Sequence, residues 1–189
     1  MCVINGGGFL RDMRTAMDYV RAAEPIIVKL LNGGRFMPVE GSDDEVCRML
    51  DTTCGTDYFQ VYDHSGLVWG VASRMQEINA SLHRPFNTFT VRKARESGVK
   101  TEYEKRRYAI EHNGVYPFLT MQGYVDIQTG ELLSLGIART VDIMSCIDAG
   151  KAIVRHTGTE QIGQAEFYVL PWDRMRAMGK PVKVWNAGE

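Results

Sequence analysis

The chain has few residues from which a disulfide framework or a structural zinc site could be built. Among its 189 residues are four cysteines and four histidines. The cysteines, Cys2, Cys47, Cys54 and Cys146, include no C-x-x-C pair. A disulfide-rich secreted protein or a zinc module would need closer and more regular spacing. We therefore expect a chain that is held together by a hydrophobic core and that resides in the reducing cytoplasm.

Long apolar runs and an excess of either charge are also lacking. No apolar segment approaches the roughly 18 residues needed to cross a bilayer, and the first residues lack the basic and then apolar order of a secretory signal. The formal net charge is −1, so any surface that binds anions must be local. These absences predict a soluble cytoplasmic protein without a membrane partner.

What the chain does contain is typical of an ordinary globular domain. Hydrophobic residues make up 44% and charged residues 24% of the sequence, and neither value indicates a disordered or fibrous chain. No internal repeat or low-complexity linker divides the sequence. We expect residues 1–189 to form a single domain with a substantial core.

Three segments of the first two thirds carry helical signals. Residues 11–32 have helical spacing, but Pro25 interrupts it, so two helical pieces or one kinked helix are expected. Ser42-x-x-Glu45 has the pattern of a capping box that opens a short helix. Thr101-x-x-Glu104 has the same pattern and opens a helix that runs to about residue 112.

Strand signals alternate with these helices. Three short strands are expected at 57–62, 68–76 and 87–92, followed by a hairpin of 116–126 and 132–138. The C-terminal third predicts a helix at 141–149, a strand at 165–170, a helix at 171–178 and a strand at 182–185. The predicted fold class is α/β: a single mixed-sheet domain with a helix-strand-strand-strand-helix-strand core and a C-terminal strand and helix extension.

Polar side chains recur along the three short strands. Because side chains alternate between the faces of a strand, Arg74 and Gln76 share one face of the second strand. Thr88, Thr90 and Arg92 share one face of the third by the same rule. If these faces align with Asp57 at the start of the first strand, the sheet carries a polar site.

This order of elements, with Asp57 on one strand and Ala72-x-Arg74 on the next, resembles the core of the PD-(D/E)XK nuclease superfamily. The resemblance implies a metal-dependent nuclease in which Asp57 and Gln76 hold Mg²⁺ or Mn²⁺. It implies Asp57, Arg74 and Gln76 as catalytic residues, with Arg74 holding the scissile phosphate. The chain departs from the family pattern, because Ala72 replaces the second acid and Arg74 replaces the lysine.

A second carboxylate could come from a helix instead. Glu24, Glu45 and Glu104 are the candidates for this role. Glu45 and Glu104 are also explained as capping-box residues, and Glu24 precedes the proline at a helix break.

A basic stripe follows the polar strands. Seven basic residues stand against three glutamates between positions 92 and 107. The candidates for phosphate binding are Arg92, Lys93, Arg95, Lys100, Lys105 and Arg106. Such a stripe could follow a nucleic-acid backbone, because phosphate contacts dominate affinity. Alternatively, Glu102 and Arg106 are four residues apart on a helix, so part of the stripe could be an internally paired, solvated face.

Three functions of different classes remain open. The first is a metal-dependent nuclease, and the second is a non-catalytic relative that binds nucleic acid. For both, DNA is favoured over RNA as the partner. The third is a small inhibitor module of a phage or plasmid that engages a protein partner. The oligomeric state is not predicted.

Overall fold

The computed structural model describes residues 6–39, 43–95, 98–157 and 165–189, which form five helices, one π-helical turn and nine strands within these ranges. The helices are α1 (Gly6–Leu30), α2 (Glu45–Met49), α3 (Glu102–Glu111), α4 (Thr140–Asp148) and α5 (Trp172–Ala177), and the π-helical turn is η1 (Leu50–Cys54). The strands are β1 (Arg35–Pro38), β2 (Tyr58–Tyr62), β3 (Leu67–Ile78), β4 (Thr88–Arg95), β5 (Leu119–Asp126), β6 (Leu132–Arg139), β7 (Ile153–Thr157), β8 (Ala165–Pro171) and β9 (Lys183–Asn186).

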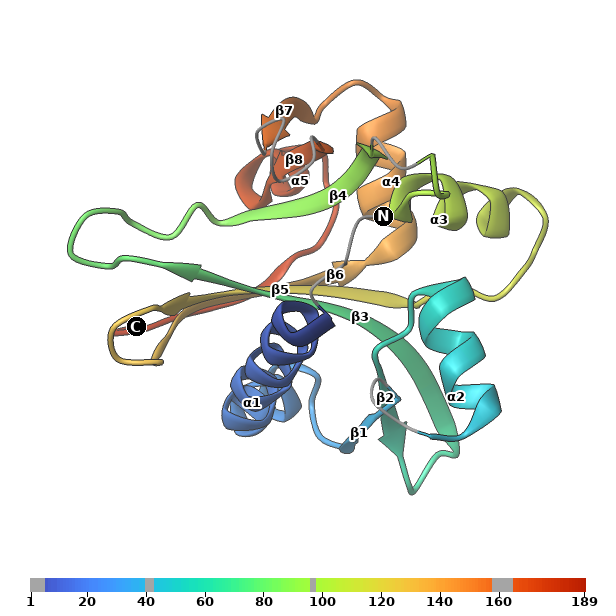
Figure 1. The fold of residues 1–189 in the computed structure, drawn as a ribbon, viewed down its shortest axis with the longest axis horizontal. Coiled ribbons are helices and arrows are strands. Elements are labelled where there is room, and N and C mark those ends of the chain that lie inside the picture. The colour runs from blue at the N-terminus through green and yellow to red at the C-terminus, as the bar shows by residue number, and fades with distance from the viewer. Residues whose placement is uncertain (1–5, 40–42, 96–97, 158–164) are drawn as a thin grey trace.

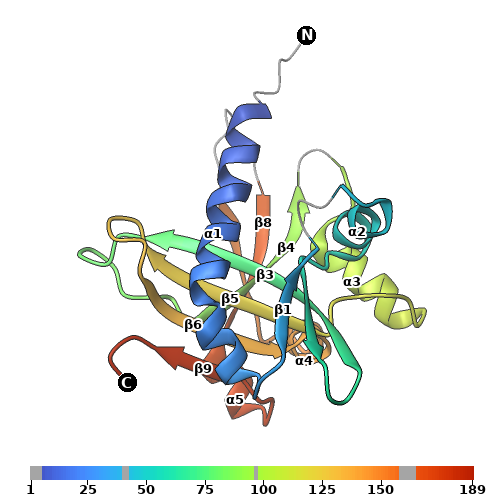
Figure 2. The same ribbon diagram turned by 90° about the horizontal axis from the view of Figure 1, so that it is seen from below.

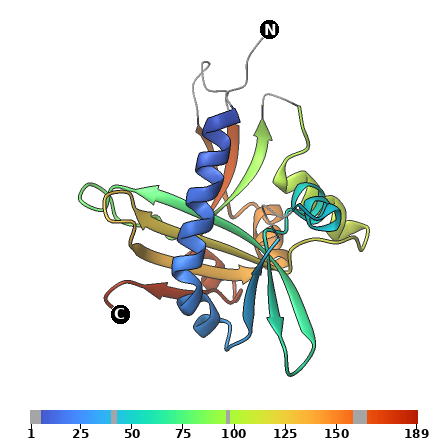
Figure 3. The same ribbon diagram turned by 60° about the horizontal axis from the view of Figure 1, so that its bottom comes forward.

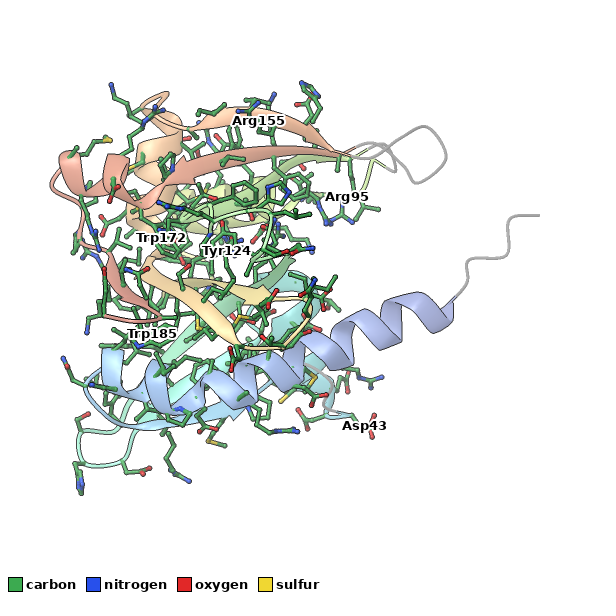
Figure 4. The ribbon with its side chains drawn as sticks, turned by 90° about the vertical axis from the view of Figure 1, so that its left-hand side faces the viewer. Asp43, Arg95, Tyr124, Arg155, Trp172 and Trp185 are labelled. Atoms are coloured by element: carbon green, nitrogen blue, oxygen red, sulfur yellow. The ribbon has the colours of Figure 1, made fainter. Side chains whose placement is uncertain are left out.

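The strands form two sheets that face each other (Figure 1). A six-stranded sheet has the order β1-β2-β3-β5-β6-β9, and a three-stranded sheet has the order β4-β8-β7. Strands β3 and β5 run parallel, whereas the other neighbouring pairs run antiparallel. Helix α1 covers the face of the six-stranded sheet that points away from the second sheet (Figure 4). The predicted α/β class is confirmed.

Strand β4 lies in a different place from the one the sequence suggested. The expected neighbour of β3 was the strand at 87–92, but β3 pairs with β5, and β4 pairs with β8 in the second sheet. The connection formed by residues 79–87 carries the chain from one sheet to the other (Figure 1). The polar faces of β3 and β4 therefore meet across the space between two sheets.

Helix α1 is one helix, although Pro25 lies inside it. The buried residues on its inner face recur at helical spacing: Val20, Ala23, Ile27 and Leu31. They pack on apolar side chains of the six-stranded sheet, such as Val71 and Met121. The helix lies across the strands, and its first turns extend beyond the sheet (Figures 2 and 3). Asn32 and Gly33 have positive φ angles of 64° and 104° and end the helix where it was predicted to end.

A second apolar core fills the space between the two sheets. Trp172 is its largest fully buried side chain, and its ring centroid lies 5.9 Å from that of Phe89 and 6.1 Å from that of Tyr124 (Figure 4). The indole lies against the backbone of β6 at Gly136, where an added Cβ would come within 2.4 Å of its Cε2 atom. A glycine is therefore needed at this point of closest approach.

Local signals in the sequence located most other elements. Thr101 and Glu104 form the predicted capping box, and the predicted hairpin is present as β5 and β6. Helices α4 and α5 and strands β8 and β9 have bounds within one residue of those expected. Asp44 caps α2, whereas Ser42, the predicted cap, lies outside the described residues. Strand β7 was not predicted.

No helix within the described ranges combines the length and the apolar character that crossing a membrane requires.

Candidate anion-binding site

A polar layer lies between the two sheets, beside the apolar core. Arg74 pairs in register with Gln122, and Gln76 pairs with Tyr124, so that β3 and β5 present these side chains to one face. Gln122 is buried, and its Nε2 atom donates to Gln76 Oε1 at 3.4 Å. Its Oε1 atom accepts hydrogen bonds from β4, at 3.1 Å from the backbone nitrogen and 2.9 Å from the hydroxyl of Thr90.

Strand β4 presents the predicted polar face to this layer. The hydroxyl of Thr90 also accepts a hydrogen bond from Arg74 Nη1 at 3.1 Å. Next to it, the Tyr124 hydroxyl donates to the backbone oxygen of Thr88 at 3.0 Å and accepts from the backbone nitrogen. Burial raises the pKa of Tyr124, so its phenol stays neutral. Thr88 and Thr90 thus lie on one face of β4, which faces the side of the six-stranded sheet that bears Arg74.

Glu102, the first residue of α3, is the carboxylate around which the charged part of the layer is arranged. Its Oε1 atom lies 2.6 Å from Arg106 Nη2, and its Oε2 atom lies 3.3 Å from Arg74 Nη2. The same Oε2 atom accepts a hydrogen bond from the backbone nitrogen of Arg92 at 3.1 Å. Burial raises the pKa of Glu102, but the charges of Arg106 and Arg74 and the Arg92 hydrogen bond outweigh burial and hold the pKa below its usual range.

Three arginines interact with Glu102, namely Arg74, Arg92 and Arg106, and Arg95 lies near Arg92; we call these four residues the arginine cluster. The guanidinium carbons of Arg74 and Arg92 each lie 5.3 Å from the ring centroid of Phe167 on β8. Burial lowers the pKa of Arg92, and the positive charges of Arg74 and Arg95 lower it further. Arginine keeps its charge even so, so like charges are held close together in the folded protein.

Several donors of the cluster are left unused within the part of the chain that the structure describes. The buried Nε atoms of Arg92, Arg95 and Arg106 have no hydrogen-bond partner there, and neither does Nη1 of Arg106. Arg106 is only 2% exposed. A buried donor without a partner costs free energy, and Arg92 and Arg95, which are only partly buried as residues, have donors that a ligand could use.

The site is partly exposed to solvent. The side chain of Arg74 is 31% exposed and that of Glu102 is 25% exposed. Arg95 lies toward the free end of β4 (Figure 4). A small anion could therefore reach Arg74, Arg92 and Arg95, while Arg106 adds charge from behind Glu102.

Asp57, a predicted metal ligand, lies just before β2 and bonds to the backbone of β3. Its Oδ2 atom accepts a hydrogen bond from the backbone nitrogen of Ser73 at 2.5 Å. Gln76 lies three residues further along β3, about 10 Å at the rise of a strand, and its amide oxygen is bonded to Gln122. The two predicted metal ligands are thus held apart by separate partners.

A divalent metal needs several oxygen ligands that lie close together. Mg²⁺ takes carboxylate and water oxygens in a near-octahedral arrangement at about 2.1 Å. No three histidine, cysteine, aspartate or glutamate side chains gather for such a role within the described ranges. Glu104 is held by the capping box, Glu45 lies in the first turn of α2, and Glu24 lies on α1, across the six-stranded sheet. Asp57 and Gln76 therefore do not fit the predicted magnesium or manganese site.

The basic stripe does not form one continuous surface. Arg92, Arg95 and Arg106 join the cluster, but the three lysines are engaged elsewhere. Lys93 Nζ lies 2.7 Å from Glu166, Lys100 lies over the Tyr108 ring, and Lys105 donates to the backbone oxygen of Thr52. The predicted pair of Glu102 and Arg106 is present, but it is not a solvated one, because Arg106 is buried.

Sequence reasoning missed two residues that organise this site. Glu102 was not among the predicted site residues, and Gln122 was not singled out. The alternation of Thr120, Gln122 and Tyr124 within a strand of otherwise apolar residues was the available signal, because it marks a polar face on a buried strand.

No protein-family model matches the sequence, and no curated protein matches it. Only the residues themselves indicate a ligand, and the arginine cluster indicates an anion.

Proposed function

We propose that this protein binds nucleic acid and that the arginine cluster holds a phosphate group of the bound strand. The observation that carries the proposal is the arginine cluster itself, in which Arg92 and Arg95 have donors without partners among the described residues. Guanidinium groups bind phosphate through paired N–H donors and keep their charge when buried. Phosphate contacts supply most of the affinity of proteins that bind nucleic acid.

Helix α3 also carries groups suited to the rest of a nucleic-acid strand. Tyr108 is 58% exposed, its ring is stacked on His112 at 4.2 Å, and Lys100 Nζ lies 5.2 Å from its centroid. Exposed aromatic rings beside cations are typical platforms for the bases of single strands. The helix therefore carries charged groups on its inner face and an aromatic ring on its outer face.

The test measures binding of labelled single- and double-stranded DNA and RNA by fluorescence anisotropy over a range of salt concentrations. The logarithm of the binding constant is expected to fall linearly with the logarithm of the salt concentration. Each phosphate contact should add about 0.7 to 0.9 to the steepness of this slope. Arg92→Gln and Arg95→Gln should each weaken binding and reduce this slope. Their folding should be preserved, because each change removes a charge from a crowded positive group.

Arg84→Gln is the matched control, because Arg84 is exposed in the connection before β4 begins. It should bind as the wild type does. Absence of salt-dependent binding to every nucleic acid would reject the proposal and favour a protein partner. Binding that is equally strong in the cluster variants would show that the phosphate contacts lie elsewhere.

Metal-dependent cleavage gains no support from the geometry, because Asp57 and Gln76 are held apart. Incubation of labelled strands with Mg²⁺ or Mn²⁺, with Asp57→Ala as the comparison, tests this activity directly.

A further inference from the structure

We infer that the arginine cluster receives a terminal phosphate, the phosphomonoester at the end of a nucleic-acid strand, rather than a phosphodiester within the strand. This inference rests on the proposed function and specifies its ligand. Three properties of the site carry it: the charge of the cluster, its depth and its unused donors.

The charge of the cluster matches a dianion. The cluster holds four guanidinium groups, three of them at Glu102, and Glu104 lies near the fourth, Arg95. The excess is two positive charges. A phosphomonoester carries about −1.5 to −2 at neutral pH, because its second pKa is close to 6, whereas an internal phosphodiester carries a single charge. The monoester therefore compensates the cluster more completely.

The depth of the site favours a ligand with one attachment. Arg74 and Glu102 are less than one third exposed, and Arg106 is sealed from solvent behind Glu102. The ring of Phe167 lies against Arg74 and Arg92 and limits the space on the side of β8. An internal phosphate would have to bring a sugar on each side up to these partly buried side chains. A terminal phosphate brings only one.

The unused donors favour the same ligand. A monoester has three terminal oxygens, and an internal phosphodiester has two. Arg106 is sealed behind Glu102, so the N–H groups without partners that a ligand could use belong to two side chains, Arg92 and Arg95. Bidentate contacts from two or more guanidinium groups need the larger number of oxygens.

Competition binding with otherwise identical short oligonucleotides tests the inference. The competitors carry a 5′-phosphate, a 3′-phosphate or hydroxyl groups at both ends. A phosphorylated end should compete about tenfold or more better than a hydroxyl end, a factor that equals about 1.4 kcal/mol. This preference should vanish in Arg92→Gln and fall in Arg92→Lys, which keeps the charge but not the bidentate geometry.

The controls separate the cluster from its surroundings. Arg107→Gln changes the next residue of α3, whose exposed side chain pairs with Glu111, and should keep the preference for phosphorylated ends. Glu102→Gln should raise the affinity for phosphorylated ends, because it removes a competing anion. Arg106→Gln removes the buried guanidinium of the cluster and should also weaken the preference for phosphorylated ends. If this variant fails to fold, Arg92→Gln and Arg92→Lys still test whether the cluster prefers a phosphorylated end.

The outcomes distinguish this inference from the proposed function. Equal, salt-dependent competition by phosphorylated and hydroxyl ends would overturn the inference and leave nucleic-acid binding intact. Failure of every oligonucleotide to bind would overturn both. A mononucleotide or inorganic phosphate that competes as well as the phosphorylated strand would overturn the assignment to a strand end, because the ligand would then be a small phosphate compound.

Discussion

Gln122 Oε1 lies 2.9 Å from the hydroxyl and 3.1 Å from the backbone nitrogen of Thr90, so one amide oxygen ties the two sheets together. The same Thr90 hydroxyl accepts a hydrogen bond from Arg74. The position of Arg74 in the arginine cluster therefore depends on an uncharged pair of residues, Thr90 and Gln122. Changes at this pair should affect both the stability of the protein and the position of Arg74.

Gln122→Ala should lower the free energy of unfolding by about 1–3 kcal/mol, because it leaves the buried donors of Thr90 without an acceptor. Urea unfolding followed by tryptophan fluorescence measures the change. Gln128→Ala is the control, because Gln128 is exposed in the turn between β5 and β6, and it should change stability by less than about 0.5 kcal/mol. Equal effects of the two substitutions would contradict the role given to Gln122.

Stability should depend on pH through Glu102. Its pKa is lowered in the folded state, so the unfolded chain binds more protons in this range and stability rises with pH. The contribution is complete above the unfolded pKa of about 4.3 and is lost as the pH falls through the lower folded value. Urea unfolding at a series of acidic pH values should show a smaller loss in Glu102→Gln than in the wild type. Parallel curves would disprove a native role for the Glu102 charge.

Gly136→Ala should destabilise the protein, because the new methyl group would come within 2.4 Å of Trp172. Overpacking of a buried site costs about 1–3 kcal/mol. Gly114→Ala is the matched control, because an added Cβ there would meet Ala109 at 3.4 Å, an ordinary contact distance. Thermal unfolding of both variants measures the difference, and an unchanged melting temperature in Gly136→Ala would show that the indole can move aside.

Asp57→Ala should lower stability by about 1–3 kcal/mol, because it removes the acceptor of the Ser73 N–H group. Its affinity for nucleic acid should stay that of the wild type. Asp18→Ala, which removes an exposed carboxylate on α1, controls for the loss of a negative charge. A loss of metal-dependent cleavage in Asp57→Ala, with stability unchanged, would restore the catalytic role that the family resemblance implies.

The sequence predicted the features that depend on near neighbours. The capping box of Thr101 and Glu104, the hairpin of β5 and β6, and the end of α1 at Asn32 each arise within a few residues. The shared polar face of Thr88 and Thr90 was also correct, because it follows from the alternation of side chains along a strand.

Pairing between distant strands could not be predicted in this way. Strand β4 pairs with β8 rather than with β3, and the sequence of neither strand alone specifies this pairing. The position of Glu102 among the arginines follows from this pairing, because β4 and α3 must both reach the polar face of β3. The same residues, placed on one continuous sheet, suggested a metal site at Asp57 instead.

The placement of β8 has a consequence for the order in which the molecule matures during synthesis. Strand β8 lies between β4 and β7 and pairs with both, yet β4 ends at Arg95 and β8 begins only at Ala165. Contacts so distant in sequence form late, because a long loop must close first. While residues 165–171 have not yet left the ribosome, a nascent chain therefore carries Arg92 and Arg95 on a strand without its sheet partner, and the arginine cluster lacks the Phe167 ring.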